Sequence, residues 1–137
     1  MIQTNDTETL PLPVMEHFYT LQGEGYHQGR AAYFIRLGGC DVGCVWCDVK
    51  DSWDAEKHPK YEVGNMKSEP LMHNLNELTA SLQSAGLKTN IETSGAHPLS
   101  GTWDWICFSP KKFKEPLPGI LPVANELKVV VFNKSDF

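Results

Sequence analysis

Short apolar stretches of this chain have the residue types of buried β-strands. Residues 31–37, Ala-Ala-Tyr-Phe-Ile-Arg-Leu, lead into Gly38-Gly39 and predict a buried strand that ends in a tight loop. Further strands are predicted at residues 87–91, 103–108 and 127–132. Polar residues gather where these strands end, which is where ligands bind in parallel sheets.

One segment has the periodicity of a helix. Between Pro70 and Gly86, leucines recur at helical spacing, and Pro70 suits a first turn while Gly86 suits a C-terminal cap. These leucines are Leu71, Leu75, Leu78 and Leu82. Strands that alternate with helix or loop predict parallel β/α units. Residues 48–65 contain no apolar run.

Length and composition narrow the functional class. The chain has 137 residues and predicts one domain, since a closed eight-unit β/α barrel needs roughly 250. No apolar stretch approaches the ~20 residues of a membrane helix, and the first residues lack an export signal, so we expect a cytoplasmic protein. The net charge of −5 and scattered basic residues argue against nucleic acid and favour a small-molecule partner.

Three of the four cysteines, Cys40, Cys44 and Cys47, fall within eight residues. In a reducing compartment this grouping indicates a metal site or catalysis rather than disulfides. Glycines at 38, 39 and 43 allow a loop on which three thiolates turn inward on one cluster. Three thiolates leave one iron of a four-iron cluster without a protein ligand, and reactive metal sites need such an open position.

The three cysteines also have two structural interpretations. A zinc site could take its fourth ligand from Cys107 or from one of the histidines at 17, 27, 58, 73 and 97, and a triplet of structural free thiols is also conceivable. Cys107 lies in the apolar stretch Trp105-Ile106-Cys107-Phe108, where a buried unreactive thiol is expected. We therefore leave Cys107 out of the candidate site.

The segment Cys40-Asp41-Val42-Gly43-Cys44-Val45-Trp46-Cys47 resembles the cluster motif of radical S-adenosylmethionine proteins. Further segments resemble the 7-carboxy-7-deazaguanine synthase family, and they are Phe18 to Gly25, Phe34 to Leu37, Glu92 to Gly95, Ser109 to Lys111 and Glu126 to Val130. The similarity spans about residues 15–132. It implies an α/β fold, a partial and incomplete parallel β/α barrel, with the cluster at its C-terminal mouth.

The resemblance also implies a reaction. In this family a 4Fe-4S cluster binds S-adenosylmethionine at its open iron and cleaves it to a 5′-deoxyadenosyl radical. That radical converts 6-carboxy-5,6,7,8-tetrahydropterin to 7-carboxy-7-deazaguanine with loss of ammonia, a step toward queuosine. Mg²⁺, a flavodoxin-like electron donor and a homodimer are further family expectations, and the protein's task is to orient the reactants.

Family positions map onto residues of this chain. The substrate positions are Leu21, Gln22, Gly23 and Arg36, with Glu24 placed to pair with the guanidine-like edge of the pterin. The cofactor positions are Trp46, Asp48, Glu69, Ser94, Gly95, Ser109, Pro110 and Lys111. A guanidinium suits a carboxylate. The alternatives are a structural ion pair for Arg36 and an ordinary polar turn for Gln22 and Glu24.

The chain departs from the family pattern in two places. Val49 stands where many members have a magnesium-binding Thr, and a hard cation needs oxygen ligands. Glu69-Pro70 keeps the end of a Gly-Gly-Glu-Pro motif but lacks its glycines and the strand before it. We therefore expect a single radical S-adenosylmethionine domain over residues 1–137, incomplete between about 53 and 69 and at its C-terminus. Two rival functions are another small radical enzyme, such as a glycyl-radical activating enzyme, and a catalytically impaired cluster-binding homologue.

Overall fold

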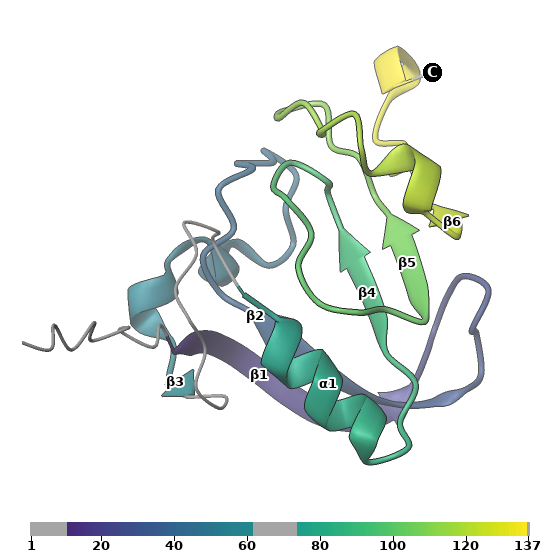
Figure 1. The fold of residues 1–137 in the computed structure, drawn as a ribbon. Helices are drawn as coiled ribbons and strands as arrows, with labels where there is room; N and C mark the ends of the chain where they lie inside the picture. Colours follow the sequence, from purple (N-terminus) through teal and green to yellow (C-terminus); the bar gives the residue numbers. More distant parts are fainter. Residues whose placement is uncertain (1–10, 62–73, 137) are drawn as a thin grey trace, which may run out of the picture.

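A computed structural model describes residues 11–61 and 74–136. The described strands form two three-stranded sheets, one antiparallel with the order β2-β1-β3 and one parallel with the order β4-β5-β6. The strands are β1 (Leu12–Leu21), β2 (Ala31–Leu37), β3 (Lys60–Tyr61), β4 (Asn90–Thr93), β5 (Trp105–Phe108) and β6 (Glu126–Leu127). The fold is therefore mixed α/β with a parallel sheet, as the sequence predicts (Figure 1).

The strand predicted at residues 31–37 is confirmed as β2, but its surroundings differ from the prediction. It forms an antiparallel hairpin with β1, in register from Leu21↔Ala31 to Glu16↔Arg36, and a register shift between Glu16 and Val14 precedes the pair Val14↔Leu37. Alternate residues are solvent-exposed, and Tyr33 keeps 51% of its surface accessible, so β2 is not a buried strand. The difference arises because residues 22–30 make a connection too short for a parallel crossover.

The helix α1 (Asn76–Ser84) is confirmed, in a shorter form than the predicted range of 70–86. Pro70 and Leu71 lie outside the described residues. Gly86 has φ +78, its N–H bonds the Gln83 carbonyl at 2.9 Å, and the Leu87 N–H bonds the Leu82 carbonyl at 3.0 Å. These two bonds form a Schellman motif, so the predicted role of Gly86 as a C-terminal cap is confirmed.

The parallel strands are displaced or shortened relative to the prediction. The strand expected at 87–91 begins at Asn90, and the N–H of buried Thr89, just before it, donates to the Asp104 carboxylate at 2.8 Å. β5 keeps the second half of the range 103–108. Only Glu126–Leu127 of the last predicted strand pairs with β5, and residues 129–132 are exposed and outside the sheet. The prediction of a strand at 127–132 was therefore wrong beyond Leu127.

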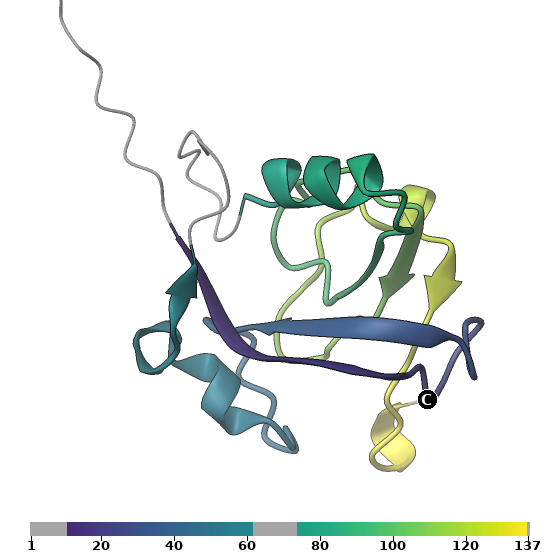
Figure 2. The ribbon, with the colours of Figure 1, turned by 90° about the horizontal axis from the view of Figure 1, so that it is seen from below.

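One hydrophobic cluster joins the two sheets to the helix. Leu12 of β1 and Leu75 at the start of α1 are buried at its centre. Partly buried residues packed against them are Val14, Leu37, Leu78, Ile91 and Trp103. Figure 2 shows α1 on one side of the parallel strands and the hairpin of β1 and β2 on the other.

The segment without an apolar run folds beside the hairpin. It forms two 3₁₀ helices, Lys50–Trp53 and Ala55–Lys57, and then reaches β3, which pairs with the beginning of β1. None of these residues adds a strand to the parallel sheet in the part of the chain that is described. No helix of the described residues is long and apolar enough to cross a membrane.

Candidate functional site

The parallel sheet has one polar face. Glu92, Cys107 and Glu126 are direct neighbours across β4, β5 and β6, so their side chains form a row on the same side. Lys128 extends from beyond β6 to bond Glu92 on this side. The opposite face carries Ile91 of the hydrophobic cluster. The row and Lys128 together make a surface that is here called the polar face.

Residues 38–49, here called the cysteine loop, follow β2 and lie beside the segments that leave β4 and β5 (Figure 1). Ser52 closes the base of this loop. Its carbonyl oxygen accepts the N–H groups of Gly39 at 2.7 Å and Cys40 at 3.0 Å, and its hydroxyl donates to the Val49 carbonyl at 2.7 Å. Gly43, at φ +71, provides the left-handed turn within the loop. The loop is therefore shaped by its own backbone contacts.

In the cysteine loop, the pKa of Cys44 depends on its burial and on the charged groups around it. Burial raises the pKa of Cys44, the neighbouring Cys40 and Cys47 raise it further, and the Lys111 ammonium lowers it. Cys47 Sγ also accepts the Val49 N–H at 3.4 Å, a contact of the kind that tunes iron–sulfur clusters. These thiols are free, and Cys40 is exposed while Cys44 is buried. The donor set is one that suits iron–sulfur chemistry.

A single-ion site is not assembled by these residues. Among residues 11–61 and 74–136, no three His, Cys, Asp or Glu side chains are placed to hold one metal ion. Thiolates that hold a four-iron cluster each bind a different iron, so they need not converge on one point. Cys107 lies away from the loop, between Glu92 and Glu126, and burial raises its pKa to about 11, with both carboxylates adding to the effect. The zinc alternative therefore gains no support from the described residues, whereas the loop thiols fit a cluster.

Asp41, next to Cys40, connects the cysteine loop to two other loops. Its carboxylate accepts hydrogen bonds from His97 Nε2 at 2.9 Å and from the Lys114 ammonium. The Lys114 bond, followed by the His97 bond, lowers the pKa of Asp41. His97 follows β4 and Lys114 follows β5, so the carboxyl ends of both strands are held against the cysteine loop.

The residues expected at S-adenosylmethionine lie at these same strand ends. Gly95 has φ +72, and a Cβ there would come within 2.9 Å of both Ile120 and Phe108. Ser109 is 1% exposed, and its hydroxyl accepts a hydrogen bond from Lys111. The structure thus brings most of the cofactor positions to one place, and they are Ser94, Gly95, Ser109, Pro110 and Lys111.

Three further cofactor positions differ in their surroundings. The Trp46 ring packs edge-on against Phe113 with the centroids 5.7 Å apart, and its buried indole Nε1 has no hydrogen-bond partner in the described part of the chain. Asp48 is exposed beside Cys47. Glu69 lies outside the described residues. Trp46 and Asp48 thus stand in the cysteine loop, within reach of a ligand bound there.

The substrate positions fall at the two ends of the hairpin. Leu21, Gln22, Gly23 and Glu24 enter the hairpin turn (residues 22–30), whereas Arg36 lies near the cysteine loop. Arg36 Nε donates to Glu16 Oε1 at 2.6 Å, and both side chains are nearly half-exposed. The described structure therefore does not bring Gln22 and Arg36 into contact. Any ligand that touches both must lie along the hairpin.

Sequence reasoning assigned no role to three charged residues of the polar face. Lys128 Nζ donates to Glu24 Oε1 at 2.8 Å and to both Glu92 oxygens at 3.1 Å. Glu126 accepts the backbone N–H of Tyr26 at 3.2 Å and Trp105 Nε1 at 2.9 Å. The signal available in the sequence was that Glu92, Glu126 and Lys128 belong to the very segments that carry the family resemblance.

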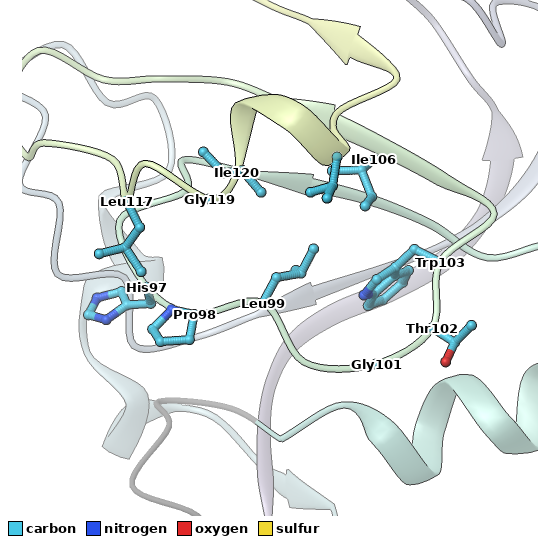
Figure 3. Close-up of a pocket in the computed structure, with 11 residues that line it drawn as sticks. His97, Pro98, Leu99, Gly101, Thr102, Trp103, Ile106, Leu117, Gly119 and Ile120 are labelled. Carbon is cyan, nitrogen blue, oxygen red and sulfur yellow. The ribbon is translucent and has the colours of Figure 1, made fainter.

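A separate apolar pocket of about 530 Å³ lies at Ile106, whose side chain points away from the polar face (Figure 3). Its wall includes Leu99, Trp103, Leu117 and Ile120. None of the cysteines or cofactor positions lines it. The pocket therefore adjoins the candidate site at His97 and Ile120 but includes none of its cysteines or cofactor positions.

The comparisons with known proteins point to one family. No family model matches the chain. It is 52% identical to the 7-carboxy-7-deazaguanine synthase of Flavobacterium psychrophilum, covering 92% of this chain and 67% of that protein, and 45% identical to the synthase of Synechocystis sp., covering 94% and 69%. The crystal structure of QueE from Escherichia coli matches with a TM-score of 0.78 at 34% identity, covering 91% and 72%.

Proposed function

Because this chain belongs to the 7-carboxy-7-deazaguanine synthase family, we propose that it converts 6-carboxy-5,6,7,8-tetrahydropterin to 7-carboxy-7-deazaguanine with loss of ammonia, in queuosine and 7-deazapurine biosynthesis. The observation that carries this proposal is the Asp41 bridge, which holds the cysteine loop between the strand ends that carry Gly95 and Ser109. Those strand ends are where ligands bind in parallel β/α folds. The two sheets are proposed to be parts of an incomplete barrel.

Cys40, Cys44 and Cys47 would hold a 4Fe-4S cluster, because they are three free thiols on one short loop. When bound, the cluster supplies the electron that cleaves S-adenosylmethionine and starts radical chemistry. The Val49 N–H would donate a hydrogen bond to Cys47 Sγ, one of the sulfurs that hold the cluster, and hydrogen bonds of this kind tune iron–sulfur clusters.

Residues at the ends of β4 and β5 would bind S-adenosylmethionine. The Gly95 backbone lies close to Phe108 and Ile120, so any side chain at this position would collide with them. Lys111 combines a bond to buried Ser109 with an electrostatic effect on Cys44, which places a positive charge between the loop and β5. Such a charge suits the carboxylate of a cofactor bound at the cluster. Trp46, Asp48 and Glu69 complete the proposed set.

The substrate would lie along the hairpin, with its carboxylate on Arg36 and its pyrimidine end near Leu21, Gln22, Gly23 and Glu24. Arg36 is already paired with Glu16, so substrate would have to compete for the guanidinium or share it. The competition is feasible because exposed ion pairs of this kind are worth only ~0–1 kcal/mol. Arg36 would then fix the C6 end of the substrate toward the cysteine loop.

Magnesium is the least supported of the inherited cofactors. The Val49 backbone is used within the loop, by its N–H to Cys47 Sγ and by its carbonyl to Ser52, and its side chain has no oxygen. A magnesium ion at this place would rely on Asp48, water and substrate. A flavodoxin-like electron donor and a homodimer are proposed on family grounds alone.

The test is anaerobic reconstitution with iron and sulfide, followed by reaction with reductant, S-adenosylmethionine and 6-carboxytetrahydropterin. Mass spectrometry should detect 7-carboxy-7-deazaguanine, and Cys44→Ser should abolish it. Cleavage of S-adenosylmethionine without this product would favour another radical enzyme. A full cluster that cleaves no S-adenosylmethionine would favour the impaired homologue.

A further inference from the structure

Lys128 is the point at which three distant segments meet on the polar face. Its ammonium bonds Glu24 in the hairpin turn and Glu92 in β4, while Lys128 itself follows β6. We propose that Lys128 is a positioning residue that holds the Glu24 carboxylate against the polar face and so orients the pyrimidine end of the substrate. This inference rests on the proposed function.

The Glu24 and Glu92 carboxylates lie close together because both are bonded to the Lys128 ammonium. Its side chain is 29% exposed, against 66% for Glu24, so the ammonium is the better shielded member of the pair. Burial lowers the pKa of Lys128, but the Glu24 bond and the Glu92 charge outweigh this and raise it, so the residue is charged at neutral pH. Without the ammonium, Glu24 would be repelled by Glu92 and would leave the polar face.

A second contact holds the same turn and limits where Glu24 can go. The Tyr26 N–H bonds Glu126 Oε1 at 3.2 Å, and a Cβ on Gly25 would lie 2.3 Å from that oxygen. The backbone of the turn is therefore fixed beside β6 independently of Lys128. Loss of Lys128 should release the Glu24 side chain while leaving the turn in place, which separates positioning from folding.

The charges suit one end of a pterin. Glu24 and Glu92 together carry −2 and Lys128 carries +1, so the group keeps a net negative charge. A carboxylate with two free lone-pair directions matches two adjacent N–H donors, such as the 2-amino group and the ring N–H of a pterin. The substrate carboxylate is on the other ring. It would be repelled here and directed toward Arg36, at the cysteine-loop end of the hairpin.

The experiment uses the full chain with its cluster reconstituted. The variants are K128M, K128R, E24Q and the double variant K128M/E24Q, with K88M as a control, because Lys88 is an exposed lysine that pairs with Asp104 away from the polar face. For each, we measure KM for 6-carboxytetrahydropterin, KM for S-adenosylmethionine, kcat, the thermal midpoint, and kcat/KM for an analogue with a 2-oxo group in place of the 2-amino group.

K128M and E24Q should each raise the pterin KM about tenfold and reduce discrimination against the 2-oxo analogue, as expected for the loss of one charge-assisted hydrogen bond. KM for S-adenosylmethionine should stay unchanged. The double variant should be no worse than either single one, because the two residues act as a unit. K128R should restore most of the loss, and K88M should keep the parent KM values and the parent discrimination against the 2-oxo analogue.

An unchanged pterin KM in K128M would overturn the inference. So would an equal rise of both KM values with a lowered thermal midpoint, which is the signature of a merely structural lysine. If K128M does not fold, the K128R and E24Q variants test the inference in its place. An E24Q variant that still discriminates against the 2-oxo analogue would overturn the inference. If the parent protein cleaves S-adenosylmethionine but forms no deazaguanine product, the proposed function fails, an outcome that differs from any of these.

Discussion

The four cysteines lie in two places, three in the cysteine loop and Cys107 in β5. Cys40 is exposed and Cys44 is buried, yet both belong to one loop whose thiols act on each other. Cys107 lies between two carboxylates, and its pKa of about 11 disfavours the thiolate that a metal requires. Because burial also raises the pKa of Cys44, it is the position of Cys107 in β5, apart from the cysteine loop, that supports its exclusion from the site.

Replacing any loop cysteine by serine should remove the cluster, whereas Cys107→Ser should not. Each of Cys40, Cys44 and Cys47 would bind its own iron, so no other thiol can substitute. Iron and sulfide content and visible absorbance after anaerobic reconstitution measure this. A Cys44→Ser protein that keeps four irons, or stoichiometric zinc in the parent, would contradict the assignment.

Arg36→Ala should raise KM for the pterin far more than for S-adenosylmethionine, because a charge-assisted contact to the substrate carboxylate is worth about 2–5 kcal/mol. Glu16→Gln is the matched control, since it breaks the same ion pair at 2.6 Å but leaves the guanidinium available. Steady-state kinetics of both variants decide the matter. If the two variants behave alike, Arg36 serves only the ion pair.

At the scale of elements, the end of β4 depends on one glycine. Gly95→Ala should destabilise the protein by about 2–5 kcal/mol, because two costs add up. The new Cβ would collide with Phe108 and Ile120, and alanine is strained at the positive φ of this position. Gly43→Ala, at φ +71 but with nothing within 4 Å, should cost only the strain of about 1–2 kcal/mol. Urea unfolding compares the two, and equal losses would show that the close packing at Gly95 is unimportant.

The start of β4 should be sensitive to acid. The Thr89 N–H, followed by Lys88, lowers the pKa of Asp104 to about 2. Because the native pKa lies below the ordinary value, the contribution of Asp104 to stability is complete above about pH 4 and is lost as the pH falls toward about 2. Asp104→Asn should flatten this part of the stability curve, measured by urea unfolding from pH 5 to pH 2. An unchanged acid slope would contradict the role.

Some elements were predictable because their signals are local. The run Trp105-Ile106-Cys107-Phe108 and the cap at Gly86 need only neighbouring residues, and both occur as predicted. β1 was missed because His17, Phe18 and Tyr19 do not alternate between apolar and polar, and they are exposed in the hairpin. A strand that finds its partner across a turn need not show a buried face in its own sequence.

The same distinction holds within the candidate site. The cysteine triplet is visible in the sequence because its members are close along the chain. The bond between Lys128 and Glu24 joins residues 104 positions apart, and no local sequence pattern predicts it. Asp41 and His97, 56 positions apart, are a second such pair. Long-range polar contacts had to come from the fold.

For the molecule as a whole, we propose that the two sheets unfold together. Leu12 and Leu75 join the hairpin to α1 and the parallel sheet in one cluster. Leu75→Ala should therefore cost about 2–5 kcal/mol and lower the stability of both sheets equally. Hydrogen exchange of β4 and β5 reports on the parallel sheet, and hydrogen exchange of β1 and β2 reports on the hairpin. Two separate transitions would show that the sheets are independent units.

The closure of the cysteine loop by Ser52 has a consequence for how the protein matures. The Ser52 carbonyl holds the Gly39 and Cys40 N–H groups, so contacts within the protein itself keep the two ends of the loop together. Closing a free loop of this kind carries an entropic cost that grows with the logarithm of its length. The hydrogen bonds to Ser52 offset part of this cost when the protein folds. The binding energy of the incoming iron and sulfide can go into forming metal–thiolate bonds instead of ordering the chain.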